Sequence, residues 1–237
     1  MLDPKGRVVL VSGASRGIGL AIAQKLLEKG YSVSLGLRDP ARAPAALAGA
    51  DASRLHLARY VAEDRASHAH WVASALARHG RIDGLVNNAG VDARTSLRDD
   101  DEAGLDRAYA INVKAPFNMI RLALPHLEAS GAGRIVNVAS MSGKRVRNDN
   151  VAYAMSKFAL VAMTHAARRT GWEKGVRATA LCPSFVRTDM TADATKIPRE
   201  QMTDPADLAE LAVTIIGLPN TASVAELLVN CRLEDML

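Results

Sequence analysis

Cysteine is scarce in this sequence, with two Cys among 237 residues, and the pair excludes two common kinds of site. Cys182 and Cys231 match neither a disulfide framework nor a CxxC metal site. The sequence also has no run of about 18 uninterrupted apolar residues, the length that a membrane-spanning helix requires. Its first residues, MLDPKGRVVLVSG, lack the layout of a signal peptide because the apolar run is short and leads into glycine. These absences predict a cytoplasmic protein that does not enter a membrane.

Dense clusters of one charge are absent as well. The 30 Lys and Arg residues outnumber the 25 Asp and Glu residues, which gives a net charge of +5, but the basic residues are scattered along the chain. This pattern argues against nucleic acid as a partner. The chain is long enough to bury a sizeable core, and 49% of its residues are hydrophobic. We therefore expect a single domain over residues 1–237.

Short β-type runs alternate with helical patterns along the chain. Repeated strand–helix units imply right-handed crossovers and a parallel sheet that helices cover on both faces. The predicted fold class is therefore α/β, with a doubly wound sheet of about seven strands. Pro116 and Pro125 should bend or break the helix predicted at 99–129. The predicted strands are residues 7–12, 31–37, 54–60, 82–87, 133–140, 176–182 and 223–230, and the predicted helices are 18–30, 65–79, 99–129, 151–172 and 204–217.

A glycine-rich segment, SGASRGIG (12–19), follows the first predicted strand and opens the first helix. Gly13, Gly17 and Gly19 let the backbone turn tightly and approach a pyrophosphate, and the start of the helix offers N–H groups and a positive dipole end. The spacing is G-x-x-x-G-x-G, which differs from G-x-G-x-x-G, and no P-loop lysine follows. A plain strand-to-helix turn would explain one glycine but not three, so we predict a dinucleotide site.

The end of the second predicted strand bears on the choice of cofactor, because it normally meets the adenosine ribose. Arg38 follows this strand, and Arg16 in the glycine loop could approach the same group from the other side. Two arginines favour the 2′-phosphate of NADP(H). Asp39 would instead accept bonds from the ribose of NAD(H) if the register slipped by one residue. A third alternative is that Arg38 and Asp39 are solvated turn residues.

The motif YAMSK places Tyr153 and Lys157 four residues apart, so both side chains share one face of the helix predicted at 151–172. The ordinary pKa of tyrosine is about 10, and an acid or base for neutral pH needs a pKa nearer to about 7. One ammonium about 4 Å away supplies roughly that shift at an effective dielectric near 20. Any amphipathic helix can carry this spacing by chance, with the Tyr ring packed on the Lys stem.

Two further polar residues point to the same place. Ser140 ends the strand predicted at 133–140, where its hydroxyl could bond a substrate carbonyl or alkoxide. Ligands of open α/β sheets collect at the carboxyl ends of strands, so Ser140, the glycine loop and the motif NNAG (87–90) should share one rim. Asn112 lies in an otherwise apolar helical stretch and is either a satisfied core amide or the holder of a water that links Lys157 to solvent.

Together, SGASRGIG, NNAG, Asn112, Ser140 and YAMSK resemble the short-chain dehydrogenase/reductase family, in its single-domain branch, over about residues 5–190. The resemblance implies a Rossmann-type fold, NAD(P)(H) as cofactor and a tetrad of catalytic residues. Tyr153 would be the acid/base, Lys157 its pKa-lowering partner and a ribose ligand, Ser140 the group that holds the substrate oxygen, and Asn112 the anchor of a proton relay. The sequence is thus expected to encode an oxidoreductase that moves hydride between NADP(H) and a carbonyl or secondary alcohol.

The resemblance also implies which residues contact the cofactor, with the NNAG strand end on its adenosine side and Thr188 at the nicotinamide amide. The chain departs from the family pattern in three places: Tyr60 stands where the family often has an acidic residue or Asn, Ser184 replaces a glycine after Pro183, and the tail PNTASVAELLVNCRLEDML lacks the usual ending. The implied cofactor residues are Gly13, Ser15, Arg16, Gly17, Ile18, Gly19, Arg38, Asn87, Ala89, Gly90, Tyr153, Lys157, Pro183 and Thr188.

The substrate side of the expected pocket leaves alternatives open. Residues 184–205 are the expected lid, on position and composition. Four basic residues near Ser140 and the lid could select an anionic substrate, although a solvated basic loop is the commoner arrangement. A cofactor-binding sensor or scaffold without turnover is the alternative to an enzyme, and the intact Tyr, Lys and Ser set argues against it. The four basic residues are Lys144, Arg145, Arg147 and Arg187.

Two remaining expectations concern metals and assembly. His68, His70 and His79 fall on one polar helical stretch, and the first two do not share a face, so we expect solvated side chains and no metal site. Members of the family usually form homodimers or homotetramers through the helices predicted here at 99–129 and 151–172, and the resemblance implies the same for this chain.

Overall fold

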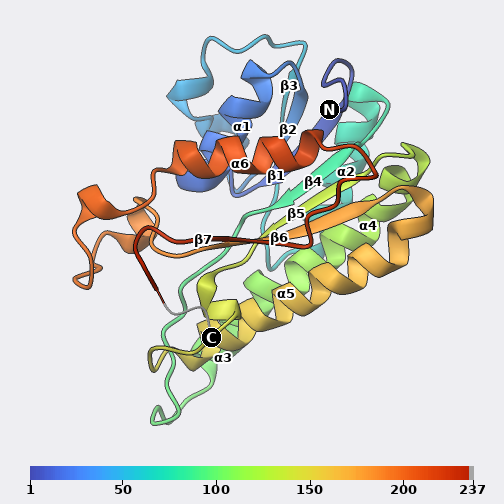
Figure 1. Cartoon of the computed structure of the whole chain (residues 1–237). Helices are drawn as coiled ribbons and strands as arrows, with labels where there is room; N and C mark the ends of the chain where they lie inside the picture. The colour runs from blue at the N-terminus through green and yellow to red at the C-terminus, as the bar shows by residue number, and fades with distance from the viewer. Residues whose placement is uncertain (235–237) are drawn as a thin grey trace.

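A parallel sheet of seven strands runs through the computed structural model, which describes residues 1–234 (Figure 1). The strand order is β3-β2-β1-β4-β5-β6-β7, so β1 and β4 lie at the centre and the chain winds outward in both directions. This arrangement confirms the predicted α/β fold. The strands are β1 (Val8–Ser12), β2 (Ser32–Leu37), β3 (Leu55–Arg59), β4 (Gly84–Asn87), β5 (Arg134–Val138), β6 (Arg177–Pro183) and β7 (Glu226–Val229).

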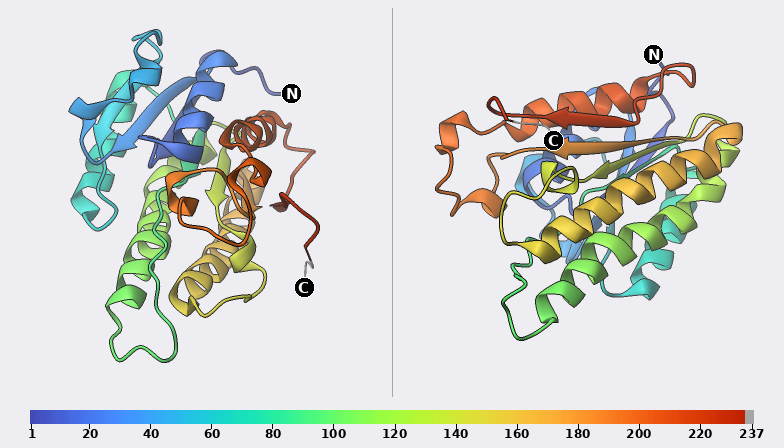
Figure 2. Two further views of the ribbon diagram at one scale, coloured as in Figure 1. Left: turned by 90° about the vertical axis from the view of Figure 1, so that its left-hand side faces the viewer. Right: turned by 60° about the horizontal axis from the view of Figure 1, so that its bottom comes forward.

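Helices cover both faces of the sheet (Figures 1 and 2). Helices α1 and α6 pack together on one face, and α2, α4 and α5 pack on the other. None of the helices within residues 1–234 combines the length and the hydropathy needed to cross a membrane. The helices are α1 (Gly17–Glu28), α2 (Arg65–His79), α3 (Ala103–Tyr109), α4 (Ala115–Ala129), α5 (Val151–Gly171) and α6 (Pro205–Gly217).

The central strand explains why the sheet needs two layers of helices. All five residues of β1 are buried, and successive side chains point to opposite faces. Val9 and Val11 join the core beneath α1 and α6, whereas Val8 and Leu10 join the core on the side of α2 and α4. A continuous apolar run of this kind suits a parallel strand buried on both faces.

The neighbours of β1 create the place where a ligand can bind. β1 pairs with β2 on one side and with β4 on the other, so the connections that leave β1 and β4 run in opposite directions. In open α/β sheets this point leaves a crevice outside the carboxyl ends of the strands. The segments after Ser12 and Asn87 therefore lie at that crevice.

The helix predicted at 99–129 is interrupted. α3 begins at Ala103, a π-helical turn covers Ala110–Lys114, and α4 resumes the regular pattern with Pro116 in its first turn. Proline is tolerated there because it needs no N–H partner in the first turn of a helix. The expected interruption is thus found just before Pro116, whereas Pro125 lies inside α4 and does not end it.

Candidate functional site

The glycine loop after β1 packs directly against the NNAG segment after β4. A Cβ atom on Gly13 would lie 2.8 Å from the Cα of Ala89, and one on Gly19 would lie 2.4 Å from the side-chain nitrogen of Asn88. Gly13 also has a φ of +66°, which disfavours any residue with a side chain. The structure therefore brings the predicted Gly13, Gly19 and Ala89 together, and both glycines are required by close approach.

Asn88 and Ser12 hold these two segments together. The Asn88 amide donates to the carbonyl oxygens of Ser12 and Gly13, at 3.1 and 3.0 Å. The Ser12 hydroxyl accepts the backbone N–H groups of Asn88 and Ala89, at 3.0 and 3.1 Å. Neither residue was among the predicted site residues. The two adjacent Asn residues of NNAG could have indicated this role for Asn88. Successive side chains at a strand end point to opposite sides, so the two amides cannot face the same segment.

Asn87, by contrast, lies inside the sheet. Its side chain is 2% exposed and donates to Asn137 Oδ1 at 2.8 Å, and Asn137 donates in turn to the Thr164 hydroxyl at 2.8 Å. The Oδ1 atom of Asn87 is buried without a hydrogen-bond partner in the described part of the chain. The Asn87 side chain thus supports the sheet centre, and the contact of residue 87 with the adenosine side of a cofactor stays a prediction.

The first turn of α1 is open to a ligand. Arg16 is the residue before the helix, and its backbone is extended. Within residues 1–234, its side chain makes no hydrogen bond that caps the helix. The N–H groups of a helix start and the positive end of its dipole favour an anion. Ser15 is exposed at this turn, and Ile18 anchors it by packing on the core beneath α1 and α6.

The segment after β6 folds back onto this turn. The Thr188 methyl carbon lies 3.2 Å from the position of a Cβ on Gly17, which has a φ of +57°. Arg16 pairs with Asp189 at 2.7 Å, and both side chains are about two-thirds exposed. A pocket of about 360 Å³ lies between the start of α1, residues 187–189 and the start of α6. Thr188 thus reaches the glycine loop from Pro183, the last residue of β6.

Arg38 and Asp39, the two residues considered as contacts of the ribose, have different surroundings at the end of β2. Asp39 caps a short 3₁₀ turn by accepting the backbone N–H of Ala41 at 3.0 Å. Arg38 is exposed, and its guanidinium forms no ion pair or hydrogen bond with another residue of the described chain. The Asp39 carboxylate thus already accepts a hydrogen bond from the backbone, whereas the Arg38 guanidinium is available to bind a ligand.

Tyr153 and Lys157 lie on the same side of α5, one turn apart. The Lys157 ammonium is 5.5 Å from the centre of the Tyr153 ring. It is buried and donates to the carbonyl of Val138 at 2.9 Å, where β5 ends. The same nitrogen lies 3.7 Å from the Cβ position of Gly90, so the NNAG segment, β5 and α5 meet at Lys157.

Asn112 joins this cluster from the π-helical turn. Its amide accepts the backbone N–H of Val91 at 2.9 Å and donates to the Val91 carbonyl at 3.0 Å. It also donates to the Ser156 hydroxyl at 3.0 Å. The Asn112 amide thus fastens the segment after NNAG to α5, and its part in a water relay to Lys157 stays a prediction.

Ser140 lies two residues beyond the end of β5 rather than within it. Its hydroxyl accepts the backbone N–H of Ser142 at 3.1 Å, which closes the turn that follows. The same side chain hydrogen-bonds Tyr153, which acts to lower the pKa of the phenol. The structure therefore brings Ser140, Tyr153 and Lys157 to one site.

Burial dominates the electrostatics of this site. Burial raises the pKa of Tyr153 to about 12, despite the opposing hydrogen bond from Ser140. Burial also lowers the pKa of Lys157 to about 8. That Lys157, together with an oxidised nicotinamide, lowers the pKa of Tyr153 stays a prediction. In the protein alone the ammonium donates to the Val138 carbonyl, and desolvation disfavours both charged forms.

The histidines also differ from the expectation. His68 is fully buried instead of solvated, and it stacks on Tyr60 with ring centres 4.8 Å apart. Asn118 contacts its Nδ1 atom at 2.9 Å and the Val61 carbonyl contacts its Nε2 atom at 3.0 Å. His70 is exposed as expected. Residues 1–234 hold no group of three potential metal ligands.

Three of the four basic residues considered for an anionic substrate have acidic partners within the protein. Lys144 pairs with Glu226 of β7 at 2.8 Å. Arg187 pairs with Asp204, directly before α6, and Arg145 pairs with Glu234 in the C-terminal tail. The picture of a solvated basic loop is therefore incomplete, because the structure neutralises these charges locally.

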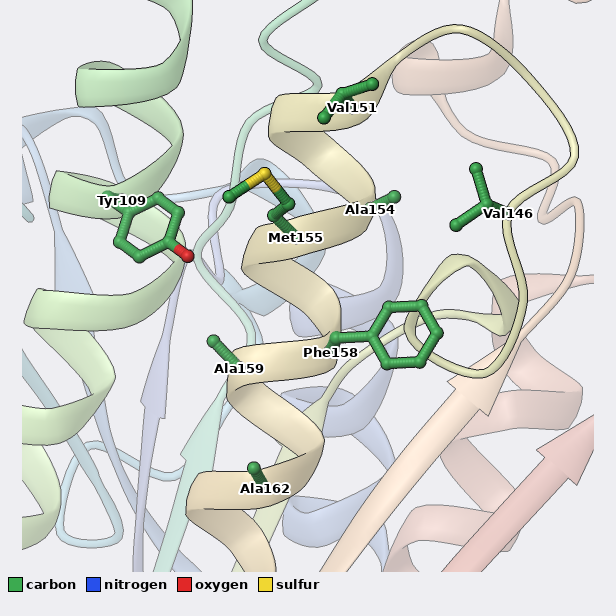
Figure 3. Close-up of a pocket in the computed structure, with 8 residues that line it drawn as sticks. All are labelled: Tyr109, Val146, Val151, Ala154, Met155, Phe158, Ala159 and Ala162. Atoms are coloured by element: carbon green, nitrogen blue, oxygen red, sulfur yellow. The ribbon is translucent and has the colours of Figure 1, made fainter.

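An apolar groove runs along the outer face of α5, away from the polar cluster. Figure 3 shows Met155 and Phe158 on this face, between Tyr109 of α3 and Val146 of the loop before α5. Met155 and Phe158 are 43% and 42% exposed, respectively. The groove has a volume of about 550 Å³ and contains none of the predicted catalytic residues.

The buried ammonium leads to a prediction for Lys157→Met. A lysine pKa lowered from 10.5 to about 8 means that the unfolded chain binds more protons between these pH values, so the wild-type free energy of unfolding rises with pH there. The variant lacks this gain. Urea unfolding at several pH values should show that the wild type gains stability relative to Lys157→Met between about pH 8 and 10. If the free energies of unfolding of the two proteins changed in parallel with pH, the lowered pKa of Lys157 would be contradicted.

Comparisons with known proteins point to one family. The family model for short chain dehydrogenases matches residues 7–198. An agropine synthesis reductase of Rhizobium rhizogenes is 44% identical over 97% of this chain but over 53% of its own length, so the chain spans about half of that relative. Oxidoreductase UcpA of Salmonella typhimurium is 33% identical, with 87% of this chain and 86% of UcpA covered.

Among solved structures, the 3-ketoacyl-(acyl-carrier-protein) reductase of Brucella melitensis, complexed with NADH, superposes with a TM-score of 0.86 at 26% identity. The match covers 95% of this chain and 96% of the reductase. Fold, motif order and sequence similarity lead to one conclusion. The chain belongs to the short-chain dehydrogenase/reductase family of oxidoreductases.

Proposed function

We propose that this protein is an NADP(H)-dependent oxidoreductase that moves hydride between the nicotinamide and a carbonyl or secondary alcohol carbon. One observation carries the proposal: Tyr153 and Lys157 share one side of α5, with the Lys157 ammonium 5.5 Å from the centre of the Tyr153 ring and donating to the Val138 carbonyl at the end of β5, two residues before Ser140. These are the groups that a carbonyl reduction requires beside a dinucleotide site.

The residues present fit a dinucleotide. A Cβ on Gly13 or Gly19 would collide with Ala89 or Asn88, so the loop keeps its backbone close to the strand ends. The start of α1 is uncapped by any side chain of the described chain, which leaves its dipole end for a pyrophosphate. The Brucella reductase was solved with NADH, which supports a nicotinamide cofactor here.

In the proposed reaction the protein positions the substrate oxygen and handles one proton. A bound nicotinamide supplies or accepts the hydride. The Ser140 hydroxyl donates a hydrogen bond to the substrate oxygen, and Tyr153 adjoins it. With a pKa of about 12, the phenol is protonated at neutral pH and can donate its proton to the oxygen as hydride reaches the carbon. The reverse reaction needs a lower Tyr153 pKa, which positive charge from Lys157 and an oxidised nicotinamide favours.

Asn112 and Lys157 have supporting roles in this proposal. The Asn112 amide fastens the segment after NNAG to α5 through Val91 and Ser156. That contact fixes the helix face that carries Tyr153. Lys157 reaches the end of β5 and the edge of the NNAG segment, where its ammonium can bond a ribose hydroxyl.

The segment 184–205 is proposed as the substrate lid. It touches the remaining structure through a bridge between Val186 and Thr203, the contact of Thr188 with Gly17 and the pair Arg16–Asp189. Exposed ion pairs contribute about 0–1 kcal/mol, so this pair opposes lid opening only weakly.

The competing function is a cofactor-binding sensor or scaffold without turnover, and Tyr153→Phe separates the two. The variant keeps the ring but loses the transferable proton, so kcat/KM for NADPH oxidation with a panel of ketones should fall by at least about 100-fold. Binding of NADPH, followed by fluorescence titration, should persist. Tyr109→Phe, on α3 beside the apolar groove, serves as the matched control and should retain activity. Absence of turnover by the wild type on every ketone would favour the sensor.

The preference for NADP(H) is proposed from Arg38, whose guanidinium is available where Asp39 is engaged in a cap. Arg38→Asp should lower the ratio of kcat/KM for NADPH to kcat/KM for NADH by about 10–100-fold, the range expected for lost charge-assisted hydrogen bonds. Arg42→Asp makes the same charge change at a nearby exposed position and should leave the ratio nearly unchanged. A wild-type preference for NADH would reject the proposal.

A second copy of the chain is proposed as the occupant of the apolar groove on α5, since contiguous exposed apolar surface marks interaction sites and family members associate through these helices. Phe158→Glu should shift the protein toward monomer in analytical ultracentrifugation. Leu97→Glu, at an apolar residue that is 88% exposed outside the groove, should not change the mass. A monomeric wild type at micromolar concentration would contradict this arrangement.

A further inference from the structure

The segment that follows NNAG is fastened to α5 at two points. At its beginning, the Asn112 amide exchanges two hydrogen bonds with the backbone of Val91 and donates a third to a hydroxyl of α5. Further along, the Thr95 carbonyl accepts the backbone N–H of Val151, the first residue of α5, at 2.9 Å. Residues 92–94 therefore lie between two anchors on this helix.

Asn150 reinforces the second anchor and binds a carboxylate of the held segment. It lies directly before α5, and its side-chain oxygen accepts the backbone N–H of Tyr153 at 3.3 Å and that of Thr95 at 3.4 Å. Its side-chain nitrogen donates to Asp92 Oδ1 at 2.5 Å. An asparagine makes both kinds of contact because its amide carries an acceptor and a donor. One side chain thus ties the Asp92 carboxylate to the helix turn that carries Tyr153.

The charge of Asp92 is only weakly compensated. Its ion pair is with Arg94, whose Nε atom lies 3.6 Å from Asp92 Oδ2. The Arg94 side chain is 73% exposed and that of Asp92 is 31% exposed, and water screens an exposed pair of this kind. The carboxylate is more enclosed than its basic partner, so its negative charge remains effective toward the protein.

This charge acts on the Tyr153 phenol. Burial is the main cause of the raised pKa of Tyr153, the hydrogen bond with Ser140 opposes it, and the negative charge of Asp92 adds to it. A carboxylate has this effect because it disfavours the formation of a second negative charge nearby.

The other ionisable groups around the phenol belong to α5, β6 and the turn after β5. The Lys157 ammonium is 5.5 Å from the centre of the Tyr153 ring, but it donates to a backbone carbonyl and burial lowers its pKa. The Cys182 thiol of β6 lies near Lys157, and Lys144 acts on that thiol. Asp92 and a charged Lys157 therefore have opposite effects on the phenol, because the carboxylate disfavours the phenolate and the ammonium favours it.

We propose that Asn150 and Asp92 are positioning residues: Asn150 holds the Asp92 carboxylate where it keeps Tyr153 protonated, and the pair thereby sets the pH range of alcohol oxidation. The proposal rests on the proposed function, in which Tyr153 is the acid/base. In the oxidation, the phenolate takes the proton of the alcohol hydroxyl while hydride leaves the carbon for the oxidised nicotinamide. A carboxylate that disfavours the phenolate raises the pH at which this reaction becomes fast.

The pH profile of alcohol oxidation tests this role, with saturating NADP⁺ and the secondary alcohol that corresponds to the best ketone substrate. Asp92→Asn keeps an acceptor for the Asn150 amide but removes the charge, so the rise of kcat with pH should move to lower pH by at least about 0.5 pH unit. Asp100→Asn makes the same change at an exposed position of the same segment and should match the wild type. Asp92→Glu restores the charge and should move the profile back.

Asn150→Ser tests the link from the helix side. Serine retains the cap of α5 but removes the amide that holds Asp92, so the released carboxylate is screened by water and its effect on Tyr153 falls. The profile should move in the same direction as in Asp92→Asn, by a smaller amount. The double variant should show the same profile as Asp92→Asn alone, because both substitutions act through one charge.

Carbon-13 NMR of ring-labelled tyrosine follows Tyr153 without turnover, and Tyr153→Phe identifies its signal. With NADP⁺ bound, Tyr153 should titrate at lower pH in Asp92→Asn than in the wild type. An unchanged Tyr153 titration in folded Asp92→Asn would overturn the proposal, as would a shift of equal size in Asp100→Asn. If no ketone or alcohol reacts but the Tyr153 titration still shifts, the proposed enzymatic function fails while the effect of Asp92 on the phenol stands.

Discussion

The close contact between the glycine loop and the NNAG segment is the constraint on which the rest of the site depends. Asn88 and Ser12 join the end of β4 to the end of β1 through four hydrogen bonds of 3.0–3.1 Å. Two glycines permit that approach, since a Cβ on either would overlap its neighbour. The contact fixes the start of α1 at the switch point of the sheet, where the free N–H groups of a helix start favour an anion.

Burial has opposite consequences for the two ionisable groups on α5. It raises the pKa of Tyr153 to about 12 and lowers that of Lys157 to about 8, so the protein by itself favours the neutral form of each. The phenol is consequently protonated at neutral pH and a weaker acid than an exposed tyrosine. The chemistry of the pair is therefore tied to the charge of whatever binds beside it.

The loops around the site neutralise their own charges. Lys144, Arg145 and Arg187 each meet a carboxylate from β7, the C-terminal tail or the segment before α6. These acids come from regions 17 to 89 residues away in sequence, so the balance of charge in the pocket is a property of the folded chain.

The amino-acid sequence by itself determined the α/β sheet, the glycine loop and the spacing of Tyr153 and Lys157, because these depend on local periodicity and on residues close together in the chain. Strand ends and helix breaks were less well defined: Ser140 falls beyond β5, and a π-helical turn carries Asn112. Only the tertiary structure decided that Asn88 rather than Asn87 faces the glycine loop, that His68 is buried, and that Glu234 meets Arg145. Burial and long-range pairing decide these features, and both arise from which distant segments the sheet brings into contact.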